Sequence, residues 1–214
     1  MDRMEQMLAF ARNCAKEAGK IQLSYFRGNH LHIETKFNMH DVVTVADKES
    51  ERYIIGEIKR AYPEHAILGE ESGMHAGDSE YCWVIDPLDG TSNYIHDMAP
   101  YSVSIALRDR EELLLGVVYE VCRNECFYAW KGSKAYLDGK EIRVTDVAVL
   151  DKAFVALGFP YDSDHYRPVA QKLVDRLYGY AGGTRLLGSA AAELCYVACG
   201  RFDARIEGHL GPWD

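Results

Sequence analysis

The sequence predicts a mixed protein of two units, an α+β unit over residues 1–145 and an α/β unit over residues 146–214. Three observations support this division. A long apolar stripe at helical spacing opens the chain, adjacent antiparallel strands follow in its middle, and strands and helices alternate from Asp151 onward. The chain has 214 residues, 48% of them hydrophobic, and can therefore bury a core without disulfide bonds.

The first predicted helix covers residues 2–26, and Gly28 is expected to end it. Its apolar positions recur at alternating steps of three and four residues, which places them on one face. A coiled coil would show the same spacing, but this stripe is rich in small residues and spans only about three heptads. We therefore expect the helix to pack on a sheet. The stripe consists of Met4, Met7, Ala11, Cys14, Ala18, Ile21 and Tyr25.

The rest of the first unit is predicted as a second helix among short strands. The helix is expected at residues 45–61, with Ile54, Ile58 and Ala61 on its buried side. Asp138-Gly139 is a hairpin turn signal. Strands are expected at residues 31–36, 42–44, 66–68, 82–85, 101–107 and 113–119, the last two antiparallel.

The second unit is predicted from a change of pattern rather than from a linker. No internal repeat, low-complexity tract or flexible linker marks a boundary near residue 145. Alternation of strands and helices indicates an α/β arrangement. The expected elements are a strand at 153–157, a helix at 165–179, a strand at 184–187, a helix at 189–199 and a strand at 203–207.

The charge and hydropathy of the chain argue against two classes of partner. A formal net charge of -9 repels nucleic-acid phosphates, and no basic stripe with interleaved aromatics offsets it, so we expect no nucleic-acid partner. The first residues are charged where a signal peptide is apolar, and no charge-free apolar run is long enough to span a bilayer. We therefore expect a cytoplasmic protein with no membrane partner.

The six cysteines are too sparse for a disulfide scaffold, and we expect reduced, mostly buried thiols. Cys122 and Cys126 are four residues apart, as are Cys195 and Cys199. That spacing leaves a zinc site open as an alternative, although the usual two-residue ligand spacing is missing.

The most informative segment is a turn that follows an apolar strand, Asp86-Pro87-Leu88-Asp89-Gly90-Thr91. Its two aspartates flank a proline-stiffened turn, so both carboxylates and the Leu88 carbonyl can converge on one point. Gly90 and Thr91 would open a short helix whose free amides suit a phosphate. The alternative is that Asp86 ends a strand and Asp89 caps a helix, as such residues often do.

Three further acidic segments lie up and down the chain from this turn. Glu70 and Glu71 follow an apolar strand; adjacent like charges repel, so a buried acid there requires a cation, whereas a solvated loop does not. Asp47 lies in the first turn of the second helix, where acids ordinarily interact with the helix dipole. The last segment contains Glu207 and, seven residues later, Asp214.

Taken together, four motifs in this order resemble the inositol monophosphatase family. They are Asp-x-Val-Thr-x-x-Asp ending at Asp47, Gly-Glu-Glu-Ser around Glu70, Trp-Val-Ile-Asp-Pro-Leu-Asp-Gly-Thr-x-Asn ending at Asn93, and Trp-Asp at Asp214. The resemblance extends over the whole chain. It implies the layered αβαβα sugar-phosphatase fold, and since relatives continue past Trp-Asp, the second domain is expected to be incomplete.

The resemblance also implies roles for individual residues. Glu70, Asp86 and the Leu88 carbonyl would bind a first magnesium ion, and Asp86, Asp89 and Asp214 a second, within a cluster of two or three Mg²⁺ ions. Glu70, Asp47 and Thr91 would be catalytic, the last two activating a water molecule. The substrate would be bound by Asp89, Gly90, Thr91, Ser189, Ala190 and Glu207.

The expected function is magnesium-dependent hydrolysis of myo-inositol 1-phosphate or a similar small polyol phosphate. Asn93 supports this expectation, because relatives that cleave 3'-phosphoadenosine 5'-phosphate usually carry Lys-Glu-Phe after the threonine. That substrate, fructose-1,6-bisphosphate, histidinol phosphate and NADP stay open as alternatives within the resemblance. A non-catalytic metal- or phosphate-binding protein is the alternative of another class. The resemblance further implies lithium sensitivity and a homodimer.

Overall fold

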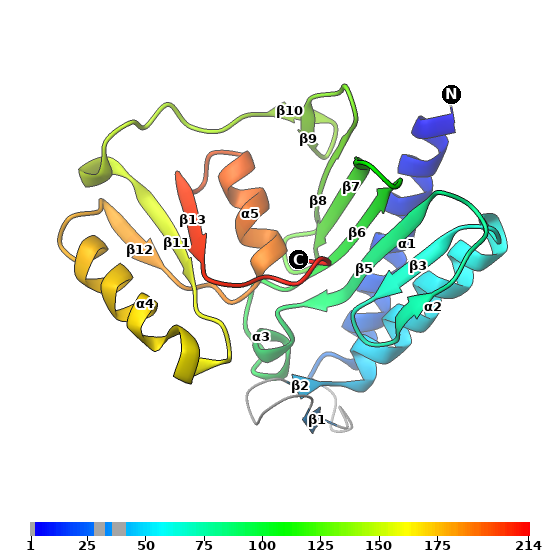
Figure 1. Cartoon of the computed structure of the whole chain (residues 1–214), viewed down its shortest axis with the longest axis horizontal. Helices are drawn as coiled ribbons and strands as arrows, with labels where there is room; N and C mark the ends of the chain where they lie inside the picture. The colour runs from blue at the N-terminus through cyan, green and yellow to red at the C-terminus, as the bar shows by residue number, and fades with distance from the viewer. Residues whose placement is uncertain (1–2, 28–32, 36–41) are drawn as a thin grey trace.

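A computed structural model describes residues 3–27, 33–35 and 42–214. Figure 1 shows a large sheet on one side of the molecule and a small sheet on the other, with helix α5 (Ala190–Ala198) between them. The chain therefore folds as two sheets that share one helical layer.

The large sheet contains most of the strands of the first unit. Its strands are β3 (Ala66–Gly69), β4 (Gly73–His75), β5 (Cys82–Asp89), β6 (Ser102–Arg108), β7 (Leu113–Glu120), β8 (Glu125–Trp130), β9 (Ala135–Leu137) and β10 (Lys140–Ile142). Within residues 3–27, 33–35 and 42–214 this sheet has eight strands, in the order β10-β9-β8-β7-β6-β5-β3-β4. The β3–β5 pair is parallel and the other pairs are antiparallel.

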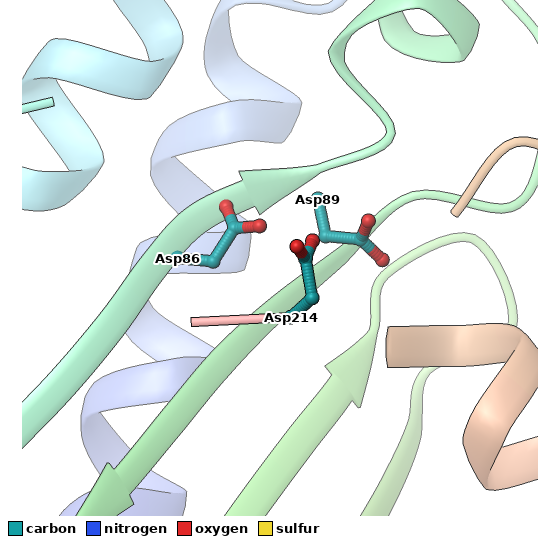
Figure 2. Close-up of side chains that lie close together, drawn as sticks. All are labelled: Asp86, Asp89 and Asp214. Carbon is teal, nitrogen blue, oxygen red and sulfur yellow. The ribbon is translucent and has the colours of Figure 1, made fainter. Parts of the chain in front are cut away.

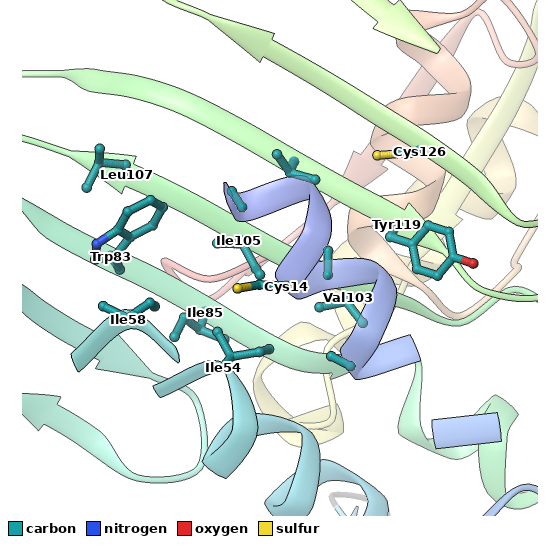
Figure 3. Packing of buried hydrophobic residues seen from close by; sticks show 14 of the residues in the cluster. Cys14, Ile54, Ile58, Trp83, Ile85, Val103, Ile105, Leu107, Tyr119 and Cys126 are labelled. Atoms are coloured by element: carbon teal, nitrogen blue, oxygen red, sulfur yellow. The ribbon is translucent and has the colours of Figure 1, made fainter. Parts of the chain in front are cut away.

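Helices α1 (Arg3–Tyr25) and α2 (Val45–Ala61) cover one face of the large sheet. In Figure 3, Cys14 of α1 lies among Ile54 and Ile58 of α2 and Ile85 and Ile105 of the sheet. The small residues of α1 let it approach the strands closely, and the predicted packing of this helix on a sheet is confirmed.

The small sheet belongs to the second unit. In the described part of the chain it consists of β12 (Gly183–Arg185), β11 (Phe154–Gly158) and β13 (Ala204–Glu207), with β11 in the middle and both pairs parallel. The remaining α-helix of this unit is α4 (Ser163–Leu177), which follows β11. The strand–helix alternation predicted from Asp151 onward is confirmed.

Neighbouring side chains on two strands establish the order of the layers. On β8, Cys126 belongs to the core beneath α1, whereas Phe127 packs with Tyr196 of α5. On β11, Ala156 belongs to the core with Tyr196, whereas Val155 packs with Leu177 of α4. Successive side chains of a strand point to opposite faces. The described residues thus form the layers αβαβα, as predicted.

The other predicted elements agree with the observed ranges to within a few residues. One residue predicted to be buried is exposed, and four observed strands were not predicted. Ala61, predicted on the buried side of α2, is exposed, because it is the last residue of the helix. Strands β4, β8, β9 and β10 were not predicted, although the Asp138-Gly139 turn does join β9 to β10. Of the strand expected at 31–36, β1 (Glu34–Thr35) is present and pairs with β2 (Val42–Val43); residues 31, 32 and 36 lie outside the described residues, as do Gly28 and Asp41.

The structure gives the state of the cysteines and the apolar character of the helices. All six cysteines are free, but only Cys14 and Cys126 are buried and Cys122 is exposed, so the expectation of mostly buried thiols is wrong. The candidate metal cluster found among the described residues consists of aspartates rather than cysteines. No described helix combines the length and the apolar character that crossing a membrane requires.

Candidate active site

The site is built on the turn at the end of β5, where Gly90 starts helix α3 (Thr91–Ile95). Gly90 has a φ of 92°, which is unfavourable for residues with a side chain. A Cβ atom there would also lie 3.1 Å from the Pro100 carbonyl oxygen and 3.2 Å from that of Gly188. Glycine therefore lets the turn pack against the loop before α5.

Three aspartates converge beside this turn. Asp86 and Asp89 come from β5 and Asp214 from the last described residues, and each contributes a carboxylate oxygen to a group whose atoms all lie within 4.8 Å of one another. Figure 2 shows the three side chains together at the end of β5. Only 2% of Asp86 and 6% of Asp89 are exposed. Several negative charges are thus held together in a poorly solvated place.

The pKa values of these carboxyl groups reflect that crowding. Burial raises the pKa of Asp86 well above its usual value, and the neighbouring Glu70, Asp89 and Asp214 add to the effect. Burial, with the charge of Asp89, raises the pKa of Asp214 to about 6. The pKa of Asp89 is also raised by burial, although its hydrogen bonds oppose the shift. A cation among these groups would relieve the repulsion.

Glu70 lies directly after β3 and lines the same cavity as the aspartates. Its amide donates to the Ile85 carbonyl at 3.0 Å, which fixes the loop to β5. Glu51 of α2 holds the next residue, since its Oε1 accepts from the Glu71 amide at 3.0 Å. Gly69 is needed beside Glu51, because a Cβ atom at that position would overlap the carboxylate. The loop that presents Glu70 is therefore held from two sides.

Thr91 connects the turn to α2. Its hydroxyl lies 3.0 Å from Asp47 Oδ1 and 3.0 Å from the Leu88 carbonyl oxygen. Asp47 is buried, and its Oδ2 accepts from the amide and the hydroxyl of Thr44, which closes the capping box of α2. Oδ2 of Asp47 therefore lies at the start of the helix, as the sequence-based alternative described, whereas Oδ1 faces Thr91.

Asp89 is hydrogen-bonded to the start of α5. Its Oδ2 accepts from the Ser102 hydroxyl at 3.0 Å, from the Ala191 amide at 3.0 Å and from the Ser189 hydroxyl, and its Oδ1 accepts from the Ala190 amide at 2.9 Å. A carboxylate oxygen has about two lone pairs. Oδ1 is therefore the oxygen that retains capacity for a cation. The alternative that Asp89 caps the helix after its own turn is wrong, because Gly90 is the N-cap of α3 and Asp89 instead accepts from the first amides of α5.

The remaining predicted residues lie in two places. Gly90, Thr91, Ala190 and Glu207 line one cavity of about 430 Å³ together with the carboxylates. Ser189, expected to contact the alcohol part of a substrate, is instead 1% exposed and directed at Asp89. The sequence did not reveal three contacts whose partners are at least twelve residues apart: Glu51 with Glu71, Ser102 with Asp89, and Arg205 with Glu193.

Comparisons with known proteins identify the family and the related solved structures. Residues 3–214 match the model of the inositol monophosphatase family. The solved IMPase of Thermotoga maritima is 32% identical with a TM-score of 0.88, covering 97% of this chain and 78% of that one. For the inositol monophosphatase of Anabaena the values are 34% identity and a TM-score of 0.86, covering 100% of this chain and 79% of that one.

Similar sequences include proteins with another name. The Nus factor SuhB of Salmonella typhimurium is 38% identical over 212 residues, which cover 99% of this chain and 79% of that protein. The Escherichia coli protein of the same name gives the same values. The comparisons therefore do not support the expectation that the protein has no nucleic-acid partner. On the match over nearly its whole length, the chain belongs to the inositol monophosphatase family.

Proposed function

We propose that this protein is a magnesium-dependent phosphatase of the cytoplasm that hydrolyses a small polyol phosphate, of which myo-inositol 1-phosphate is the first candidate. The observation that carries the proposal is the convergence of Asp86, Asp89 and Asp214 in one cavity with Glu70 and the Thr91 hydroxyl. Membership of the inositol monophosphatase family supports it.

Magnesium fits the residues present. The donors are carboxylate and carbonyl oxygens, which Mg²⁺ prefers, and the raised pKa values of Asp86 and Asp214 indicate crowded, buried carboxyl groups. Glu70, Asp86 and the Leu88 carbonyl would hold one ion, and Asp86, Asp89 and Asp214 another. Bound ions would supply positive charge to the phosphoryl oxygens and lower the pKa of the attacking water.

Thr91 and Asp47 are proposed to orient that water and accept its proton. When the Thr91 hydroxyl donates to Asp47 Oδ1, its oxygen can accept a hydrogen bond from water. The two bonds from Thr44 occupy Asp47 Oδ2, so Oδ1 is the atom that would receive a proton through the hydroxyl. The chain then acts by placing a water molecule, without a covalent phosphoenzyme.

The ends of the substrate would be bound by different units. The amides of Gly90 and Thr91, at the start of α3, would hold the phosphate. Ala190 and Glu207 line the cavity on the side of the second unit and would face the alcohol. The metal-binding side would therefore recognise the phosphate, which all these substrates share. The wall formed by Ala190 and Glu207 would recognise the alcohol part, which distinguishes them.

Phosphate release from a panel of monoesters, with magnesium and with EDTA, tests the proposal. We expect release only with magnesium, and fastest from a polyol phosphate. Faster release from 3'-phosphoadenosine 5'-phosphate, fructose-1,6-bisphosphate, histidinol phosphate or NADP would replace the substrate. Absence of release from every ester would refute the enzymatic function and favour a non-catalytic binding protein.

A second candidate function is that of a Nus factor, favoured by 38% identity to proteins of that name. Complementation of an Escherichia coli strain that lacks SuhB separates the two candidates. Rescue by wild type and equally by Asp86→Asn would favour the second function, whereas rescue by wild type alone would favour a role that needs the metal site.

A further inference from the structure

A buried arginine lies in the cavity wall that β13 contributes. Among the described residues lining the cavity, Arg205 is the sole arginine or lysine. Only 5% of its side chain is exposed. A fixed positive charge beside a cluster of acids, in a place suited to the alcohol part of a substrate, requires an explanation.

Arg205 connects two glutamates. Its Nε donates to Glu193 Oε2 at 2.8 Å, and its Nη2 donates to Glu207 Oε2. Glu193 is 1% exposed and is itself anchored, because its Oε1 accepts from the Leu187 amide at 2.7 Å. A chain of bonds therefore runs from the loop before α5 through Glu193 and Arg205 to Glu207.

The small sheet holds Glu207 from the other side. Gly158 of β11 is the register partner of Glu207 on β13. A Cβ atom at position 158 would overlap the Glu207 carboxylate and would lie 2.8 Å from its Oε1. Glycine thus leaves the space that the carboxylate occupies, and Arg205 fixes the carboxylate in it.

Glu207 Oε1 and Arg205 Nη1 take no part in these hydrogen bonds. No described residue donates to Glu207 Oε1 or accepts from Arg205 Nη1, and both side chains line the cavity. A hydroxyl group is both donor and acceptor. Two neighbouring hydroxyls can satisfy the pair, one donating to Glu207 and the other accepting from Arg205, whereas a simple alcohol leaves both polar groups unpaired.

We propose that Arg205 is a specificity-determining residue, which fixes Glu207 and selects phosphate esters of polyols with neighbouring hydroxyls over esters of simple alcohols. The inference rests on the proposed phosphatase function and deepens it by naming a second determinant of substrate class. A site built to hydrogen-bond hydroxyls rejects analogues that lack them, because its own polar groups then stay unpaired.

The test compares kcat/KM for myo-inositol 1-phosphate and for n-butyl phosphate, at saturating magnesium. In Arg205→Gln we expect the ratio of the two values to fall about 10- to 100-fold, as expected for a lost hydrogen bond to a charged group, mainly through KM for the polyol ester. Arg205→Lys should restore the ratio only in part, since it lacks the planar fork. The matched control is Arg201→Gln, which removes an ion pair with Glu125 outside the cavity lining and should leave the ratio unchanged.

A double variant distinguishes positioning from an independent effect. If Arg205 acts through Glu207, Arg205→Gln should lower the ratio much less in a Glu207→Gln background than in wild type. Gly158→Ala, which displaces Glu207 while keeping all three charges, should lower the ratio as well, and it provides the test if Arg205→Gln does not fold.

Several outcomes would overturn the inference. They are an equal loss for both esters, fully additive losses in the double variant, or an unchanged ratio in Gly158→Ala. Each of these presupposes an active wild type. A wild type that releases phosphate from neither ester refutes the proposed function itself, so the two failures are distinguishable.

Discussion

The two ends of the cavity hold their acids in different ways. At the end of β5, Asp86, Asp89 and Asp214 converge without an arginine or lysine among the described lining residues near them. At β13, Glu193 and Glu207 are joined by Arg205. The first cluster has no arginine or lysine to balance its charge, whereas the second largely carries its own counter-charge. Under the proposed function, metal supply would control the chemistry of the site and the chain itself its selectivity.

The largest expected effect comes from Asp86→Asn. Bound metal contributes several kcal/mol to phosphoryl transfer, so losing the ligand that is proposed to serve both ions should lower kcat at least about 10³-fold. The metal-free variant should nevertheless be more stable than wild type by about 1 kcal/mol, or about 2–4 °C in Tm, because one buried charge is removed. Steady-state assays at saturating magnesium and thermal melts in EDTA measure the two effects. Turnover above a few per cent of wild type would contradict the two-metal assignment.

Arg205→Gln should have the opposite effect on stability. Removing the cation leaves two buried glutamates unpaired, which costs about 3–5 kcal/mol in the free energy of unfolding. Arg201→Gln breaks a more exposed pair with Glu125 and should cost about 1 kcal/mol or less. Urea unfolding of both variants measures the difference. Equal losses would mean that the buried ion pair contributes no more to the free energy of unfolding than the more exposed pair. That result would contradict the comparison between the two ends.

Thr91→Ala tests the water-orienting pair. Without the hydroxyl, kcat should fall about 10²-fold, as for loss of a general acid–base group, while KM changes by less than about threefold. Thr91→Ser is the matched control and should retain most of the turnover. A rise in KM alone would make Thr91 a substrate-binding residue and would remove Asp47 from the mechanism.

The smallest effect is a pH dependence of the metal-free protein. Burial raises the pKa of Asp214 to about 6, whereas an unfolded aspartate has a pKa of about 3.9. Between these values the folded state retains a proton that the unfolded state has lost, so the free energy of unfolding decreases as pH rises, by about 1 kcal/mol after allowance for partial exposure. Thermal melts of wild type and Asp214→Asn in EDTA, from pH 4 to 7, give the contribution as a difference. A difference independent of pH would show that Asp214 is not crowded.

Local patterns and the family resemblance anticipated much of this molecule. Asp86, Asp89 and Thr91 could be placed together because a short turn joins them. Strand β8 was missed because residues 126–130 are a continuous apolar run without the polar alternation that identifies strands; Cys126 faces α1 and Phe127 faces α5.

The contacts that were missed depend on register and distance. Arg205 faces Glu193 because α5 packs beside β13, and Ser102 meets Asp89 because β6 pairs with β5. Neither partnership leaves a periodic signal in the sequence. For Asp47 the sequence predicted the position in the first turn of a helix, whereas its hydrogen bonds to Thr44 and Thr91 were seen only in the fold.

Asp89 has a consequence that concerns the relation between the two units. Its carboxylate takes hydrogen bonds from the first amides of α5 and belongs to the aspartate group suited to a cation. Under the proposed function, a bound cation would share this negative charge with the helix, and the two binding energies would be linked. By reciprocity, a shift of α5 relative to β5 should change the affinity for magnesium. Bound magnesium should change the free energy with which α5 packs against β5 by the same amount. The affinity for the cation would then depend on how one unit packs against the other.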